Sequence, residues 1–196
     1  CLGLAREITR DDDVSRYLDA AHQELLRANE LLSRLRDLNQ RTAPEDRAPT
    51  DINTLVRRLL TLTERQARDQ GVTLRADLSE EVPPLRLAAD AMQQVFLNLT
   101  LNALEAMPTG GSLRICTEVS AEREVRVAFA DTGPGVAPED VERIFQGFFS
   151  TKSHGLGLGL FLCQSIVQQH GGRIALESAP GAGATFTVCL PVESPF

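Results

Sequence analysis

Two hydrophobic patterns alternate along residues 50–192 and predict a mixed α/β domain. Apolar residues that recur every three to four positions predict helices, whereas apolar residues at every second position predict half-buried strands. The first pattern predicts helices at residues 52–70, 88–107 and 157–170, and a short one at residues 138–144. The second predicts strands at residues 73–78, 112–119, 125–130, 173–178 and 184–190. This order of elements favours a two-layer α/β sandwich, with helices on one face of a mixed sheet.

The first 40 residues carry a heptad repeat instead. Apolar or small residues follow one another in steps of four and three, at Val14, Leu18, Ala21, Leu25, Ala28, Leu32 and Leu35. This spacing predicts one long helix of a bundle over about residues 14–40. Residues 2–8 fit the tail of a preceding antiparallel helix, and the polar residues 41–50, with two prolines, fit a linker. We therefore expect a helical segment at residues 1–45 and a separate domain at residues 46–196.

Composition limits the classes of function. The 196 residues, 42% of them hydrophobic, suffice for one domain with a core and an extension. No apolar run approaches the roughly 18 residues of a bilayer span and no secretory signal is present, so we expect a cytoplasmic chain whose parent could be anchored only through upstream segments. The net charge of -7 disfavours nucleic acid as a partner. The cysteines lack CxxC spacing and fit reduced core residues: Cys1, Cys116, Cys163 and Cys189.

A polar stripe interrupts the apolar helix predicted at residues 88–107. Asn98, Asn102 and Glu105 stand at i, i+4 and i+7, so their side chains share one helical face. Buried amides need partners, and a hard cation with phosphate oxygens is one such partner. The alternative is that the asparagines cap or tie neighbouring loops. Two glycine clusters elsewhere in the chain favour the ligand-binding interpretation.

The first glycine cluster is DTGPG, at the end of the strand predicted at residues 125–130. The Asp131 carboxylate can accept a hydrogen bond from an exocyclic amine such as that of adenine. Gly133 and Gly135 let the backbone approach a flat base without a side-chain clash. Taken alone, DTGPG fits an ordinary turn equally well.

The second cluster, GLGLG at residues 155–159, opens an apolar helix. The N-terminal amides and the dipole of such a helix would face an anion. GxGxG alone is a weak signal. It has neither the GxxxxGK[ST] spacing of a P-loop nor the preceding strand of a dinucleotide-binding turn. The phosphate site is therefore of another kind.

The order of these segments resembles the catalytic domain of sensor histidine kinases, in the GHKL ATPase superfamily. NLTLNALEAM, DTGPGVAPEDVERIF, FFSTK and GLGLGL resemble its N box, first glycine box, F box and second glycine box. Residues 93–111 are most similar to the nitrogen-regulation and oxygen-sensing branch. The resemblance covers residues 50–192 and implies a Bergerat-type ATP-binding fold, with ATP and Mg²⁺ as cofactors.

The resemblance also implies roles for individual residues. Asn102 would be the magnesium ligand, and Asn98 would contact phosphate or the shell of the metal. Asp131 would read the adenine amino group, and Gly133 and Gly135 would border the base.

The segment at residues 136–155 would be a mobile ATP lid. Lys152 would reach the phosphates from this lid, and with Asn98 and Asn102 would carry the transfer. The triphosphate would be held at Gly155, Leu156, Gly157, Leu158 and Gly159, and the hydrophobic anchors of the lid would be Phe145, Phe148 and Phe149. The sequence departs from the family pattern at Gly147, where proline is usual, and at Leu156, where threonine is frequent; Gly147 would make the lid more mobile.

The N-terminal segment resembles the end of the first helix and the second helix of the dimerisation and phosphoacceptor hairpin of these kinases. The acceptor histidine belongs in the middle of the first helix, which this sequence does not contain. His22 lies on the second helix and lacks the acceptor's sequence context, so it fits bundle packing. His154 fits either a phosphate contact or a solvated loop, and His170 fits a helix end before two glycines. The implied partners are a second copy, through the N-terminal helices, and the receiver domain of a response regulator.

We thus expect the catalytic core of a two-component histidine kinase that transfers the γ-phosphoryl of Mg-ATP to a histidine outside this chain. A neutral imidazole nucleophile needs no general base. The first alternative is an ATP-hydrolysing clamp like those of gyrase, mismatch-repair and heat-shock chaperone ATPases, which carry a glutamate at the position of Asn98; an amide cannot take a proton from water. The others are a nucleotide-regulated dimerisation scaffold, and a serine kinase of the anti-sigma type, which leaves the heptad helix unexplained.

Overall fold

The computed structural model describes residues 47–150 and 157–192. By its contacts the chain divides into two units, Cys1–Gln40 and Arg41–Phe196, and every described residue belongs to the second. The heptad segment predicted at residues 14–40 lies outside the described residues. None of the helices in the described ranges combines the length and hydrophobicity that a bilayer span requires.

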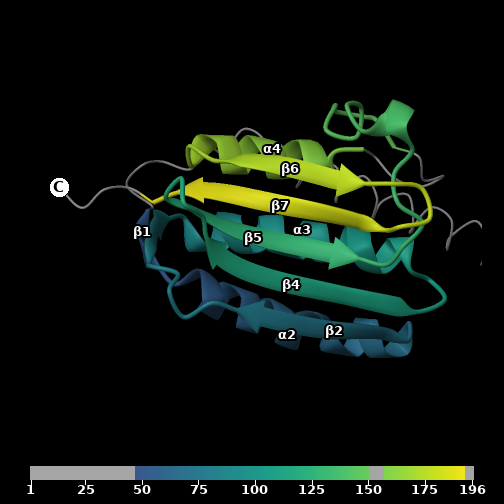
Figure 1. Ribbon diagram of the computed structural model, residues 1–196, viewed down its shortest axis with the longest axis horizontal. Helices are drawn as coiled ribbons and strands as arrows, with labels where there is room; N and C mark the ends of the chain where they lie inside the picture. The colour runs from purple at the N-terminus through teal and green to yellow at the C-terminus, as the bar shows by residue number, and fades with distance from the viewer. Residues whose placement is uncertain (1–46, 151–156, 193–196) are drawn as a thin grey trace, which may run out of the picture. The chain divides into compact units, whose positions relative to one another are not determined.

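The described unit is a two-layer α/β sandwich, as the sequence predicts (Figure 1). Its five-stranded sheet has, in spatial order, β2 (Val72–Leu78), β4 (Gly111–Val119), β5 (Glu124–Asp131), β7 (Ala184–Pro191) and β6 (Arg173–Ser178). The β2–β4 pair is parallel and the other three pairs are antiparallel, so the sheet is mixed.

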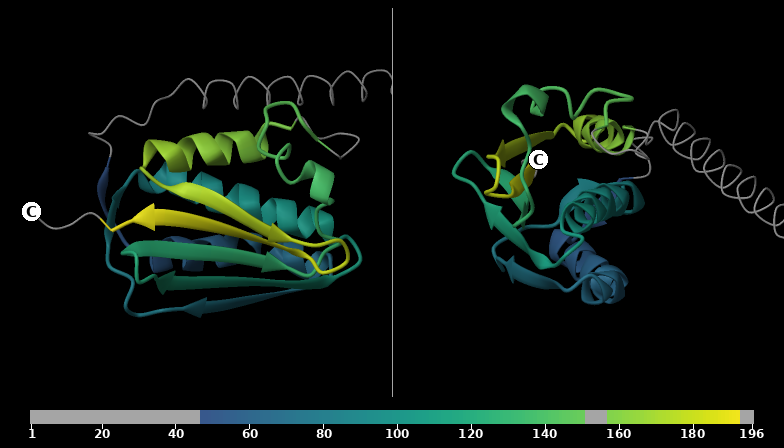
Figure 2. Two further views of the ribbon diagram at one scale, coloured as in Figure 1. Left: turned by 45° about the horizontal axis from the view of Figure 1, so that its top comes forward. Right: turned by 90° about the vertical axis from the view of Figure 1, so that its right-hand side faces the viewer.

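Three helices cover one face of the sheet: α2 (Ile52–Asp69), α3 (Ala89–Ala106) and α4 (Gly159–Gln169). In the end-on view of Figure 2, α3 lies between the other two helices. Burial alternates along β5, so that Val125, Val127, Phe129 and Asp131 all face the helices. The Phe129 ring meets Phe96 of α3 at 5.5 Å between centroids. This contact packs the buried face of α3 directly on β5.

Two features differ from the sequence prediction. The linker predicted at residues 41–50 ends in a strand, β1 (Ala48–Thr50), which pairs with β3 (Leu85–Leu87) in a separate two-stranded sheet. Strands of three residues are too short to show an alternation. The short lid helix predicted at residues 138–144 is only a 3₁₀ helix, η3 (Pro138–Asp140), followed by turns. Arg143 N–H donates to the Asp140 carbonyl at 2.9 Å, an i to i+3 bond that is typical of the tighter helix.

Candidate functional site

Asp131 ends β5 with its side chain buried between the sheet and the helices, where it is 9% exposed. Its Oδ1 accepts hydrogen bonds from the backbone N–H of Gly133 at 2.8 Å and of Ala184 at 3.3 Å. Burial raises the pKa of this carboxyl, and the two amide donors oppose the rise. Its Oδ2 has no hydrogen-bond partner among the described residues. One oxygen therefore holds the loop, and the other is left for the donor of a ligand.

The loop after Asp131 packs against the end of α3. A Cβ atom added at Gly133 would lie 3.2 Å from the Ala106 Cβ and 2.9 Å from Asp131 Oδ1. Thr132 fixes the loop to β4, since its N–H donates to the Ser112 carbonyl at 3.1 Å and its Oγ1 accepts from the Ser112 N–H at 3.0 Å. The last turn of α3 and the Asp131 loop are therefore neighbours, as the predicted site requires.

Gly135 must be glycine for a reason of packing. Its φ is +75°, and a Cβ there would lie 2.2 Å from the Ala179 carbonyl oxygen in the turn between β6 and β7. Ser178 ties the same turn to the start of the predicted lid, because its Oγ accepts from the Val136 N–H at 2.9 Å and donates to the Gly183 carbonyl at 2.7 Å. Sequence reasoning missed Ser178, since a lone serine at a strand end gives no signal.

Asn98 and Asn102 lie on α3 and are half-buried. Neither side chain forms a hydrogen bond with any residue in the described part of the chain. They therefore do not tie neighbouring described loops, which was the alternative left open by the sequence. Asn102 is one helical turn before Ala106, which contacts the Asp131 loop. Asn102 thus lies one turn, and Asn98 two turns, from the contact of α3 with the Asp131 loop.

The second glycine cluster places the start of α4. Gly157 has a φ of +66°, and a Cβ there would lie 2.3 Å from the Phe149 carbonyl oxygen, so this position requires glycine. Leu158 is buried, and α4 begins at Gly159 with neither a side-chain cap nor an acidic residue in its first turn. Such an uncapped N-terminus leaves N–H groups for an anion.

Helices α3 and α4 run antiparallel, and two contacts fix their register. Cys163 Sγ lies 3.8 Å from the Val95 carbonyl, and the Ala88 N–H donates to His170 Nε2 at 3.1 Å. Seven residues separate the partners on each helix. Continued for one more turn, this register puts Gly159, the start of α4, beside the turn of α3 between Asn98 and Asn102.

The lid residues differ in their packing. The Phe145 ring meets Phe186 edge-on at 6.4 Å, and Arg143 stacks over Phe149 at 4.3 Å. Phe148 is 76% exposed with a φ of +67°, so its prediction as a hydrophobic anchor is wrong. The remaining residues predicted to bind phosphate lie outside the described residues: Lys152, Gly155 and Leu156.

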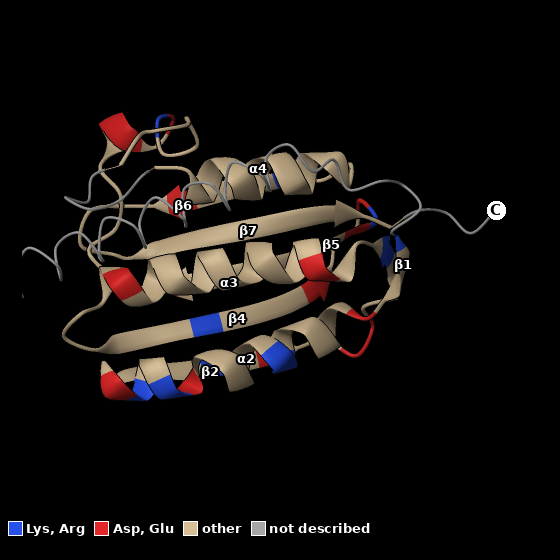
Figure 3. Cartoon of the chain, turned by 180° about the vertical axis from the view of Figure 1, so that it is seen from behind, with Lys and Arg blue, Asp and Glu red and all other residues tan. Residues whose placement is uncertain are grey.

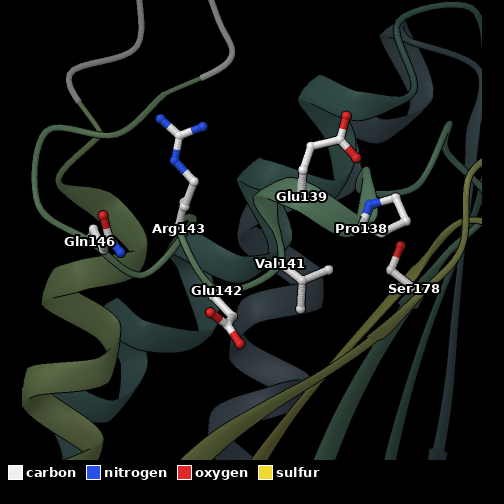
Figure 4. A pocket seen from close by; sticks show the side chains of 7 residues that line it. All are labelled: Pro138, Glu139, Val141, Glu142, Arg143, Gln146 and Ser178. Atoms are coloured by element: carbon white, nitrogen blue, oxygen red, sulfur yellow. The ribbon is translucent and has the colours of Figure 1, made fainter.

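A cavity lies beside these elements but contains none of the predicted site residues. It is lined by Pro138, Glu139, Val141, Glu142, Arg143, Gln146 and Ser178 (Figure 4). The side chains of Glu139 and Glu142 point in opposite directions, so its acidic groups do not converge. We therefore assign no ligand to this cavity.

Few charges line the helices of the site. Asp90 and Glu105 are the only charged residues of α3, and α4 has none (Figure 3). The two helices thus offer amides and a helix N-terminus to a phosphate, but no cationic side chain.

Comparison with known proteins agrees with this arrangement. Residues 88–194 match the family described as "Histidine kinase-, DNA gyrase B-, and HSP90-like ATPase". Sensor histidine kinase ZraS of Klebsiella oxytoca is 37% identical over 171 residues, which are 87% of this chain and 37% of ZraS. Signal transduction histidine-protein kinase AtoS of Escherichia coli (strain K12) is 31% identical over 190 residues, 97% of this chain and 31% of AtoS. The chain spans about a third of the length of these curated relatives.

Solved structures show the same fold. The nucleotide-free catalytic domain of histidine kinase ThkA is 31% identical with a TM-score of 0.67, over 74% of this chain and 95% of that one. Full-length ShkA in complex with AMPPNP is 27% identical with a TM-score of 0.74, over 90% of this chain and 38% of that one. ThkA in complex with the response regulator protein TrrA has a TM-score of 0.74 at 24% identity, over 97% of this chain and 55% of that one. The last likeness concerns the fold alone.

Proposed function

Since this chain belongs to the family of histidine kinase-, DNA gyrase B- and HSP90-like ATPases, we propose that it is the catalytic core of a two-component sensor histidine kinase. It binds Mg-ATP and directs the γ-phosphoryl to a histidine outside this chain. The relatives ZraS, AtoS and ThkA are all histidine kinases, which supports a kinase rather than another branch of the family.

The residues present fit ATP. Asp131 Oδ2 lies at the end of β5 without a described partner and can accept from the adenine amino group. A Cβ at Gly133 would lie against Asp131 Oδ1, so glycine there keeps a side chain away from this carboxyl, and the uncapped start of α4 suits the phosphates. Gly135 is proposed to border the base from its sequence alone. Lys152, Gly155 and Leu156 are proposed for the same phosphates from their sequence alone. The structure of ShkA with AMPPNP supports an adenine nucleotide as the ligand.

The lack of cationic side chains on α3 and α4 supports a metal ion. The negative charges of the triphosphate would repel one another beside two helices without cationic side chains, and a bound Mg²⁺ would neutralise part of that charge. Asn102 Oδ1 is the proposed ligand, and Asn98 would hold phosphate or a water of the metal shell. Both amides have the necessary freedom, since neither is engaged by the described residues.

The observation that carries the choice of reaction is the pair of free amides on α3. An amide at position 98 cannot take a proton from water, so the domain orients phosphate but does not itself activate a hydrolytic water there. A neutral imidazole attacks without losing a proton first, and positioning is then the main task of the site. These amides favour transfer to histidine over the hydrolysis of an ATP-driven clamp.

We further propose two partners and a location. The heptad residues at 14–35 would pair with a second copy of the chain, and the receiver domain of a response regulator would take the phosphoryl group onward. ThkA, whose catalytic domain is 31% identical to this chain, forms a complex with the response regulator protein TrrA, which supports the second partner. The domain would act in the cytoplasm, where ATP is available.

The test is to incubate this chain and the full-length parent protein separately with γ-labelled ATP and magnesium. We expect an acid-labile phosphoprotein from the parent and none from this chain. Orthophosphate release is followed in parallel. Rapid release without any phosphohistidine in the parent would support the hydrolytic clamp and overturn the proposal, and stable labelling of His22 would show that the acceptor has been misplaced.

A further inference from the structure

His170 joins the two helices that form the proposed site, at the end away from the phosphates. It is the C-cap residue of α4 and is 6% exposed. Its Nε2 accepts a hydrogen bond from the Ala88 N–H at 3.1 Å, and its Nδ1 lies 2.8 Å from the Ile166 carbonyl oxygen. Ala88 is the N-cap residue of α3, where no side chain caps the helix. One imidazole therefore connects the start of α3 to the last turn of α4.

The two partners define the protonation state of the ring. A carbonyl oxygen only accepts, so Nδ1 must carry the hydrogen that points to Ile166. The Ala88 N–H only donates, so Nε2 must be unprotonated. The ring is thus neutral, with its hydrogen on Nδ1. A second proton would set an Nε2–H group against the Ala88 N–H and remove this contact.

The charges around the ring also disfavour the second proton. Burial lowers the pKa of His170 first of all, and the nearby positive charge of Arg47 lowers it further, against the opposing effect of the Ile166 carbonyl. Arg47 is held close, since its guanidinium donates to the Gln169 carbonyl. The charged residues on adjoining segments include Arg86 on β3, Asp90 in the first turn of α3 and Arg173 at the start of β6. The last turn of α4 has no basic residue.

We propose that His170 is a positioning residue for nucleotide binding: as the neutral ring it holds the start of α3 against the end of α4, and protonation releases this hold. The inference rests on the proposed ATP site. Both helices carry groups of that site, namely Asn98 and Asn102 on α3 and the N-terminal amides on α4. Each helix is one continuous element, so a change of their separation at the His170 end would tilt one helix on the other about the Cys163–Val95 contact and alter their relative placement at the phosphate end.

The test compares the wild-type chain with His170→Gln and His170→Ala between pH 8 and pH 5.5. The Kd of Mg-ADP is measured by calorimetry, and the thermal midpoint is measured without nucleotide. The glutamine Oε1 can accept from the Ala88 N–H but cannot titrate. Because the pKa of His170 is lowered, we expect wild-type affinity to stay constant through the ordinary histidine pKa. It should fall about fivefold, the value of one hydrogen bond, as the pH drops below the lowered pKa.

Each variant has its own expected result. At pH 8, His170→Gln should bind Mg-ADP as tightly as the wild type does. Its Kd should vary less with pH, and any variation that remains comes from protonation of the nucleotide itself. His170→Ala should bind about fivefold more weakly at every pH. His22→Gln, a matched control on the heptad segment, should keep the full pH dependence of the wild type.

Two outcomes would overturn the inference. One is a His170→Gln profile that follows the wild type down to pH 5.5. The other comes from the ring ¹⁵N spectrum of the wild-type protein, a measurement that does not depend on any variant folding. We expect Nδ1 to be protonated and Nε2 to be unprotonated at pH 8. The opposite tautomer would contradict the geometry. Failure of the wild type to bind nucleotide at any pH would instead count against the proposed function.

Discussion

At the scale of single residues, Asp131 shows how one carboxyl can serve both the fold and a ligand. Its Oδ1 is used by the Gly133 and Ala184 amides, whereas its Oδ2 has no described partner. A change that keeps Oδ1 and alters only the second atom should therefore separate binding from folding. Asparagine is that change, because its amide has the same shape and replaces one acceptor by a donor.

The first prediction concerns the division of labour between base and metal. Asp131→Asn should weaken ADP binding more than Asn102→Ala does in EDTA, and the order should reverse when magnesium is added. The reason is that Asp131 is proposed to contact the base, whereas Asn102 is proposed to act through the metal. Calorimetry with and without magnesium measures both constants for each variant. Equal losses in the two conditions would contradict the assigned roles.

The second prediction concerns stability without nucleotide. Because the folded-state pKa of Asp131 is raised, this group favours the folded state at low pH, and the contribution is lost as pH rises through that pKa. Asp131→Asn cannot ionise, so it avoids this loss of stability at neutral pH while it keeps the contacts of Oδ1. Its thermal midpoint at pH 7 should therefore not fall below that of the wild type, and its relative advantage should shrink toward pH 4. A lower midpoint at pH 7 would mean that the carboxylate stabilises the fold.

Single residues also show where sequence reasoning stops. Asp131, Asn98 and Asn102 are found from sequence because each belongs to a local pattern of recognisable chemistry. Ser178 and His170 are not, since their contacts reach 42 and 82 residues along the chain to Val136 and Ala88. The sequence places His170 at a helix end but gives no sign of the Ala88 N–H that donates to its ring.

At the scale of elements, strong periodicity predicted the helices and the central strands to within one or two residues. Those elements have one buried face each, so their apolar spacing records the fold directly. The strands β1 and β3 were not predicted, because three residues are too few to show a period. The lid segment at residues 138–144 was predicted as a helix but has turns after Asp140. Three of its seven residues are acidic, so it has little apolar face to pack.

The third prediction compares two glycines of the lid region. Among the described residues, the nearest atoms to a Cβ at Gly147, apart from its chain neighbours, are those of the Phe161 ring at 3.8 Å, and no positive φ is needed there. Gly147→Ala should raise the free energy of unfolding by about 0.4–1 kcal/mol, since it restricts the unfolded chain without a clash. Chemical denaturation measures this change.

Gly135→Ala is the matched control. Its Cβ would lie 2.2 Å from the Ala179 carbonyl oxygen, at a φ of +75°. We expect it to destabilise the domain by more than Gly147→Ala stabilises it. Destabilisation by Gly147→Ala would mean that the departure from proline at this position serves the packing of the lid and not its mobility.

At the scale of the whole molecule, the described residues contain a complete core. The buried faces of α2, α3, α4 and the five-stranded sheet all belong to the unit Arg41–Phe196. The first strand of that unit, β1, begins at Ala48, and Arg47 just before it donates to the Gln169 carbonyl of α4. The boundary predicted at residues 45 and 46 falls immediately before these contacts, which makes it testable by two nearby truncations.

The last prediction uses both truncations. Removal of residues 1–45 should leave a monomer that binds Mg-ADP as the full chain does, whereas the full chain should self-associate weakly through its heptad residues, whose burial is worth about 25 cal/mol per Å² before the entropic cost of association. Removal of residues 1–50 also deletes β1 and Arg47, so it should lower the thermal midpoint and weaken binding through the loosened ends of α3 and α4. For the full chain and both truncations, sedimentation measures self-association, calorimetry measures Mg-ADP binding, and thermal unfolding measures stability. Loss of nucleotide binding already on removal of residues 1–45 would mean that the heptad segment is part of the nucleotide-binding unit and that the boundary is drawn in the wrong place.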